Sequence, residues 1–138
     1  MTTTRKPLPK ITPENKPFWD AAHRGELWQQ RCADCGAYYE PIVIDCHTCH
    51  RPEPRIEWAK VSGRGKVHTF NVYHRPYIPA FAKDVPYNTA IIELDEGPLL
   101  KSQVVGCRNE DIRIGMPVTV TFEKVSDEVS LPKFQPVK

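Results

Sequence analysis

Four cysteines in two Cys-x-x-Cys pairs constrain this chain more than any other feature of its sequence. The first pair is Cys32 and Cys35, and the second is Cys46 and Cys49. A Cys-x-x-Cys turn presents two sulfurs from one tight loop, so two such turns that face each other supply the four ligands of a tetrahedral metal. The spacing predicts a structural Zn²⁺ site. A shell closed by four thiolates leaves no position for water or substrate, so we expect this site to build structure.

The residues that follow the two pairs differ. Gly36 follows Cys35, and glycine suits a turn whose backbone takes a left-handed conformation. His50 stands at the corresponding place after Cys49 and departs from that pattern. His47 and His50 are candidate substitute ligands, but four thiolates already complete the shell. We therefore expect both imidazoles to be exposed polar groups.

Four thiols can also do other chemistry. Residues 1–7 contain no apolar stretch of the kind found in signal peptides, so we expect a cytoplasmic location, where a metal is favoured over disulfides. Iron in a rubredoxin-like electron-transfer site would use the same four ligands and is the less favoured metal. A thioredoxin-like redox pair explains one motif at a time, whereas a metal explains both together.

Composition limits the possible partners. The chain of 138 residues has 19 Lys and Arg against 17 Asp and Glu, a formal net charge of +2, which gives no general argument for nucleic acid or an acidic membrane. No run approaches the ~20 apolar residues of a membrane span. The 14 prolines favour short strands, turns and extended arms over long helices.

The order of patterns along the chain predicts a mainly β fold. We expect an arm and short helix over 1–25, with Asn15 as a cap and Gly25 at the end, then a zinc ribbon over 26–58. Alternating residues from 59 onward predict strands at 66–74, 89–94, 99–105, 117–125 and 130–137. Five strands without intervening helices favour a small closed barrel of the OB-fold type over 59–138.

Several aromatic and apolar side chains are candidates for contact with a partner. Phe18 and Trp19 must dock their short helix on another surface, either the chain's own core, which is the safer interpretation, or a partner. The proline-stiffened connection 76–87 is apolar for a loop. We expect it to bind a partner or to pack on its own barrel. Its candidate contact residues are Tyr77, Ile78, Phe81 and Tyr87.

The sequence offers no local signature for a catalytic nucleophile held by a base. Cys107 is the cysteine outside the two pairs, and we expect it to be a buried structural thiol. We assign no catalytic residue and expect no catalysis by this chain alone.

Several short motifs together carry a family likeness. The chain resembles the family of rubredoxin-like zinc-ribbon proteins with a C-terminal acyl-CoA-associated OB-fold, long known as domain of unknown function thirty-five. The resemblance covers nearly the whole chain from Phe18. Its motifs are Phe18-Trp19, Gly25-Glu26-Leu27, Arg31-Cys32-x-x-Cys35-Gly36, Cys46-x-x-Cys49, Glu57-Trp58, Ser62-Gly63-Arg64-Gly65-Lys66-Val67, Pro86-Tyr87, Glu93-Leu94-Asp95-Glu96-Gly97-Pro98, Ile114-Gly115-Met116-Pro117-Val118 and Leu131-Pro132-x-Phe134.

The resemblance implies an accessory subunit of a thiolase-superfamily enzyme. Members look like companions of thiolases, of thiolase-like retro-aldolases that degrade steroid side chains and of archaeal hydroxymethylglutaryl-CoA synthesis complexes. They hold the enzyme together and help to form the CoA channel. The implied cofactors are a structural zinc ion and CoA or acyl-CoA shared with the partner. We further expect Arg64 and Lys66, in the motif after Ser62, to meet CoA phosphates.

A single-stranded nucleic-acid-binding module is the alternative function, because zinc ribbons and OB-folds both occur in such proteins. The mild net charge argues against it. Phe70 and Tyr73 should also fall on opposite faces of their strand, which makes a poor stacking platform for bases.

Overall fold

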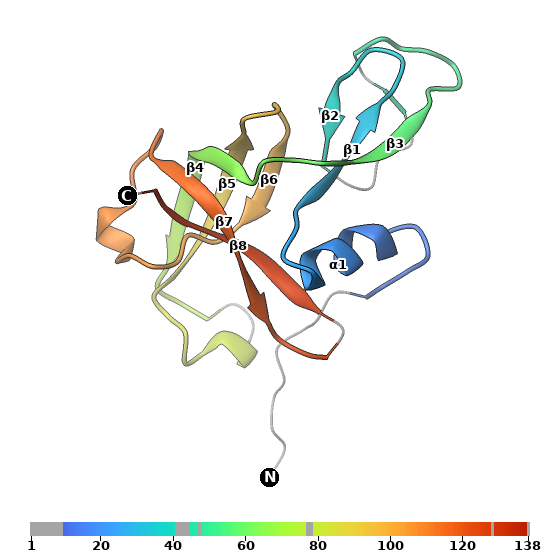
Figure 1. Cartoon of the computed structure of the whole chain (residues 1–138). Helices are drawn as coiled ribbons and strands as arrows, with labels where there is room; N and C mark the ends of the chain where they lie inside the picture. Colours follow the sequence, from blue (N-terminus) through green and yellow to red (C-terminus); the bar gives the residue numbers. More distant parts are fainter. Residues whose placement is uncertain (1–9, 41–44, 47, 77–78, 128, 138) are drawn as a thin grey trace.

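The computed structural model describes residues 10–40, 45–46, 48–76, 79–127 and 129–137. One α-helix is found in these ranges, and the strands form two sheets (Figure 1). The ribbon sheet has the order β2-β1-β3, and the larger sheet has the order β6-β5-β4-β7-β8. The elements are α1 (Lys16–His23), β1 (Trp28–Cys32), β2 (Tyr38–Tyr39), β3 (Ile56–Lys60), β4 (Arg64–Tyr73), β5 (Tyr87–Leu94), β6 (Leu99–Ser102), β7 (Pro117–Lys124) and β8 (Ser130–Pro136), with 3₁₀ turns at Pro79–Phe81 and Asn109–Asp111.

Helix α1 lies where the sequence predicts it. Gly25 takes a left-handed backbone (φ 83°) directly after it. Asn15 occupies the N-cap position but does not cap the helix. Its Oδ1 instead accepts the Thr12 N–H at 2.7 Å, and its Nδ2 donates to the Lys10 carbonyl at 3.0 Å. This side chain therefore fastens the preceding segment to the start of the helix.

The five-stranded sheet curls into a half-barrel whose two edge strands approach each other. Just after β6, the Gln103 carbonyl accepts the Phe134 N–H at 2.9 Å, and the Val105 N–H donates to the Phe134 carbonyl at 2.7 Å. These bonds join the β6 side of the sheet to β8 at one end. The predicted mainly β fold class, with a short helix, a zinc ribbon and a five-stranded OB-type sheet, is confirmed.

Strand β3 is the element that sequence patterns missed. It pairs with β1 over its whole length, from Trp28↔Lys60 to Cys32↔Ile56. An ion pair between Arg31 Nη1 and Glu57 Oε1 at 2.6 Å reinforces the pairing. The predicted division between ribbon and barrel at residue 58 falls inside this strand, and the division into domains stays a prediction.

One hydrophobic core spans the helix, the ribbon entry and the half-barrel. Phe18 of α1 and Leu27 before β1 belong to the same buried cluster as Ile92 and Phe134 of the larger sheet. Trp19 packs against this cluster and meets the Phe18 ring edge-on, with 4.9 Å between the ring centroids. Burial of each large apolar side chain contributes about 1.5–3 kcal/mol, so docking of α1 is a substantial part of the fold's stability.

No helix in the described part of the chain combines the length and the apolar character needed to cross a bilayer.

Asn88 links the loop after β6 to the sheet. Its side chain is buried, donates from Nδ2 to the Val104 carbonyl at 2.9 Å and accepts the Val104 N–H at Oδ1 at 2.8 Å. The same Nδ2 also donates to Asn109 Oδ1 at 2.9 Å. The Asn88 side-chain amide thus pairs with the backbone N–H and carbonyl of Val104 as a neighbouring strand would.

We predict that Asn88→Ala lowers the free energy of unfolding by about 2 kcal/mol, because it leaves buried backbone groups of Val104 without partners. Urea denaturation followed by circular dichroism measures this. Asn71→Ala, at an exposed position of β4, is the matched control and should stay within about 0.5 kcal/mol of the parent. Equal midpoints for the two variants would contradict the role of Asn88.

Candidate metal centre and flanking surfaces

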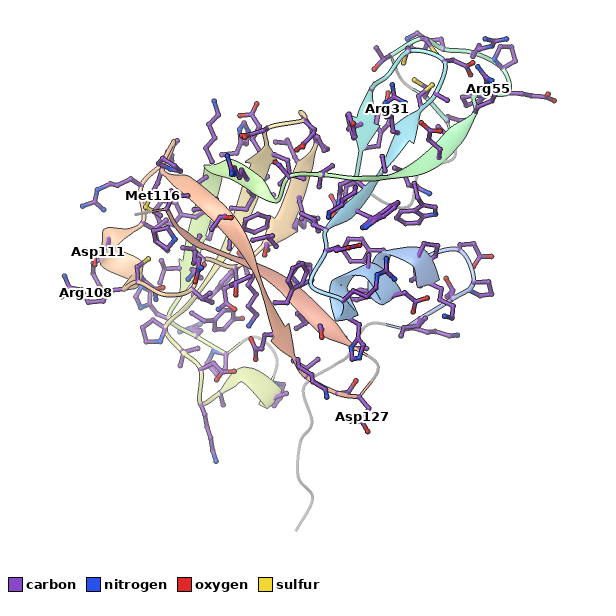
Figure 2. All side chains as sticks on the ribbon, viewed as in Figure 1. Arg31, Arg55, Arg108, Asp111, Met116 and Asp127 are labelled. Atoms are coloured by element: carbon purple, nitrogen blue, oxygen red, sulfur yellow. The ribbon has the colours of Figure 1, made fainter. Side chains whose placement is uncertain are left out.

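The four cysteine sulfurs converge at the tip of the ribbon. Their Sγ atoms all lie within 4.8 Å of one another. Cys35 and Cys46 are 3.4 Å apart at Sγ, and Cys32 and Cys49 are 3.9 Å apart. Zn–S bonds of about 2.3 Å in a tetrahedron place the sulfurs about 3.8 Å apart, so the donor set fits zinc. Figure 2 shows yellow sulfur atoms at this tip, beyond the labelled Arg31.

The two Cys-x-x-Cys turns share one backbone geometry. The Gly36 N–H donates to the Cys32 carbonyl at 2.7 Å, and the His50 N–H donates to the Cys46 carbonyl at 3.2 Å. Both residues have positive φ, 83° for Gly36 and 53° for His50. His50 thus adopts the conformation expected of a glycine, and its ring is outside the sulfur cluster found in the described residues. His47 lies outside the described residues.

Tyr39 contacts the second turn, a role that sequence patterns did not reveal. Its hydroxyl lies 3.3 Å from Cys46 Sγ and accepts the Thr48 N–H at 3.1 Å. The Cys49 N–H also points at Cys46 Sγ, at 3.5 Å. The Cys49 N–H and then the Tyr39 hydroxyl lower the pKa of Cys46 to about 5. The neighbouring Cys35 shifts the other way: although the Ala37 N–H lowers its pKa, burial and contact with the other sulfurs raise it overall. Metal binding therefore has to release the protons that remain on the cluster.

Asp34, between the first two cysteines, ties the chain leaving the ribbon tip back to the first turn. Its side chain is 4% exposed. It accepts the Arg55 backbone N–H at 3.0 Å and pairs with the guanidinium groups of Arg55 at 2.9 Å and Arg51 at 3.1 Å. The Arg55 N–H is the largest cause of the lowered pKa of this carboxyl. Asp34 therefore helps to hold the first Cys-x-x-Cys turn in place.

The candidate CoA contacts, Arg64 and Lys66, point outward from β4. Both are exposed, while Gly65 and Val67 between and after them are buried. Lys66 Nζ lies 3.4 Å from Glu93 Oε2 on the neighbouring strand. Lack of space inside the protein explains why glycine stands at positions 63 and 65. A Cβ on Gly65 would lie 2.4 Å from the Glu93 carbonyl oxygen, and a Cβ on Gly63 would lie 2.4 Å from the Val120 side chain. These glycines therefore serve close packing within the protein.

The candidate partner contacts are scattered. Phe18 and Trp19 pack on the chain's own core. Tyr87 stacks on Tyr73 with 5.2 Å between ring centroids. Tyr77 and Ile78, and the side chain of Phe81, lie outside what the structure describes.

Two further side chains can be checked against expectation. Cys107 is half-buried beside the core, and burial, followed by the nearby Asp111, raises the pKa of its thiol. Phe70 packs against the core, three residues before Tyr73, so the two rings face opposite sides of β4 as expected.

Comparison with known families covers most of the chain. Residues 19–55 match the family model of the ChsH2 rubredoxin-like zinc ribbon domain, and residues 58–123 match that of the ChsH2 C-terminal OB-fold domain. A DUF35 domain-containing scaffold protein of Methanocaldococcus jannaschii is 41% identical over 99 residues, which is 71% of this chain and 68% of the relative.

Two further similarities involve proteins named for CoA chemistry or aldolase activity. A probable enoyl-CoA hydratase alpha subunit of Thermomonospora curvata is 35% identical over 95% of this chain, which spans 40% of that protein's length. A solved structure described as "Ltp2-ChsH2(DUF35) aldolase" contains a chain that superposes with a TM-score of 0.79 at 34% identity, covering 94% of this chain and 98% of that one.

We predict that Asp34→Ala weakens zinc binding roughly tenfold, because loss of the carboxylate frees the chain that leaves the metal-binding turns. A competition titration with a chromophoric chelator measures the zinc affinity. Asp45→Ala, which removes an exposed carboxylate from the same ribbon, should leave the affinity unchanged. Equal affinities for the Asp34 variant and the parent would show that Asp34 does not support the metal-binding turns.

Proposed function

This chain belongs to the DUF35 family of ChsH2-type proteins, which join a zinc ribbon to an OB-fold domain, and we propose that it is a non-catalytic accessory subunit of a thiolase-type acyl-CoA enzyme. The observation that carries the proposal is its likeness to the ChsH2(DUF35) aldolase chain, which it covers almost completely. The enoyl-CoA hydratase alpha subunit supports the acyl-CoA part of the proposal. The thiolase-type partner follows from the family resemblance of the motifs described above.

The metal centre suits a scaffold. A zinc ion held by Cys32, Cys35, Cys46 and Cys49 would have all its tetrahedral positions filled by protein sulfur, so it would supply folding energy. The ribbon and helix α1 share a core with the half-barrel. Zinc at the ribbon tip would therefore fix the surfaces that a partner contacts, while the chemistry takes place on the partner.

Two outward-facing cations support direct contact with CoA. Arg64 and Lys66 project from the same face of β4, and guanidinium and ammonium groups form strong charge-assisted bonds with phosphate oxygens. Glu93 beside Lys66 holds its amine in position until a phosphate competes for it. In this arrangement CoA lies between the accessory subunit and the enzyme. A cytoplasmic location stays a prediction.

Co-expression with a thiolase-like protein encoded beside this one should give a complex that co-elutes on size exclusion. Cys35→Ser should release the partner, because three remaining thiolates hold zinc weakly and the ribbon loses its shape. Cys107→Ser is the control, since Cys107 lies outside the sulfur cluster, and it should retain both zinc and partner. A zinc-free complex with full activity would show that the zinc ribbon is not needed to hold the partner, and would contradict the scaffold role.

The double variant Arg64→Glu/Lys66→Glu should raise the Kd of CoA for the assembled complex by roughly tenfold or more, since it places two carboxylates where phosphates would bind. Isothermal titration calorimetry measures the Kd. The double variant Lys16→Glu/Lys124→Glu, at two exposed positions outside β4, makes the same change in net charge and is the control. Unchanged CoA affinity would remove these residues from the CoA site while leaving the scaffold role intact.

A further inference from the structure

Two of the sequence motifs described above meet where the ribbon joins the half-barrel. The chain leaves the ribbon at the first motif, residues 62–67, and β5 turns into β6 within the second, residues 93–98. The Ser62 N–H donates to Glu96 Oε2 at 2.8 Å, although the two residues are 34 positions apart in the sequence. A side chain of the β5–β6 turn therefore holds the backbone of the chain that leaves the ribbon.

This bond lies in the middle of a short connection. Residues 61–63 connect β3 of the ribbon to β4 of the half-barrel (Figure 1). The first N–H of the connection donates to the Leu27 carbonyl, just before β1, at 3.0 Å, and its last carbonyl accepts the Val120 N–H of β7 at 2.7 Å. Ser62 lies between these two bonds. Glu96 therefore acts at the point where the chain passes from the ribbon to the half-barrel.

A second carboxylate ties the other edge of the ribbon to the same hairpin. Glu40 directly follows β2, and its carboxylate accepts the backbone N–H of Lys101 in β6. Both side chains line a groove of about 580 Å³ that lies beside α1, between the helix, β6 and β8. Strands β2 and β3 are the two edges of the ribbon sheet. Glu40 and Glu96 thus connect both of these edges to the β5–β6 hairpin.

The contact at Glu96 is a poor source of stability. Its Oε1 is buried, and no donor reaches this oxygen among the residues that the structure describes. A buried polar atom without a partner costs free energy. Ser62 is exposed, so water can bind its N–H when the carboxylate is absent. The Ser62–Glu96 bond therefore adds little net stability, and its main effect is on the direction in which the ribbon leaves the half-barrel.

We infer that Glu96 and Glu40 form a carboxylate clamp that fixes the direction of the ribbon relative to the half-barrel. The shared core around Leu27 holds the base of the ribbon, and the clamp stops the ribbon from turning about that base. The consequence for partner binding rests on the proposed function. A ribbon of fixed direction can contact the enzyme partner together with the half-barrel, whereas a mobile ribbon would have to be ordered on binding, which lowers affinity.

Residual dipolar couplings of the backbone N–H groups test the clamp in the full zinc-loaded chain, whose mass of 15.8 kDa suits solution NMR. In the parent, the couplings of the ribbon strands and of the larger sheet should fit one alignment tensor. In Glu96→Leu, each of the two parts should still fit a tensor of its own, which verifies folding. The single tensor should be lost, because the ribbon moves relative to the half-barrel.

Matched variants distinguish a positioning role from a stabilising one. Glu96→Gln keeps an acceptor oxygen for the Ser62 N–H and should restore the single tensor. Asp95→Ala removes an exposed carboxylate from the same turn and should behave as the parent. The melting temperature of Glu96→Leu should be no lower than that of the parent, because the variant no longer buries an unpaired oxygen. Glu96→Ala replaces Glu96→Leu if leucine disturbs the turn.

Binding to the co-expressed enzyme partner tests the consequence of the clamp. Glu96→Leu should raise the Kd for the partner by roughly tenfold or more at unchanged zinc content, since the ribbon must then be ordered on binding. An unchanged Kd beside a lost single tensor would overturn this consequence.

The clamp itself is overturned if Glu96→Leu keeps the single tensor, or if Glu96→Gln loses it. A lower melting temperature together with a single tensor would identify an ordinary stabilising contact. If the parent chain binds no thiolase-like partner, the proposed function fails, and the dipolar couplings still decide whether the clamp fixes the ribbon.

Discussion

Closure of the ribbon tip by four sulfurs is the constraint on which the rest of this structure depends. The ribbon sheet has three strands, one of them the two-residue β2, and most of its side chains are only partly buried. So small a sheet cannot repay its conformational entropy from apolar burial alone. A metal bound by the cysteines would supply the missing free energy. Tyr39 and Asp34 then hold the two turns in the geometry that binds it.

The ribbon is joined to the rest of the molecule through the shared hydrophobic core. Leu27, just before β1, is buried with Phe18 and with side chains of the larger sheet. The Val61 N–H donates to the Leu27 carbonyl at 3.0 Å, so the chain entering the ribbon and the chain leaving it are bonded side by side. Figure 1 shows the ribbon projecting from the half-barrel at this junction.

Local chemistry explains which features could be predicted from sequence. The sulfur cluster follows from the spacing of four cysteines, and the end of α1 from Gly25, because both depend on residues close together in the chain. Strand β3 was missed because its stability comes from its pairing with β1 and from Glu57 bonded to Arg31. Asp34 and Tyr39 gave no signal, since neither residue type predicts a contact with Arg55 or with Cys46. The groove beside α1 exists only after three distant segments have packed.

The position of α1 has a consequence for how such proteins can diversify. The helix lies outside the larger sheet and packs on β1, β7 and β8, and together with β6 and β8 it lines the groove of about 580 Å³. One wall of this groove therefore belongs to neither edge strand. A change of side-chain size at Trp19 would alter the length and width of that space. The hydrogen bonds at Phe134 that join the two edges would stay as they are. The shape of the groove can thus change on the helix while the bonds that join the two edges of the half-barrel stay in place, which separates the part that adapts from the part that must keep its shape.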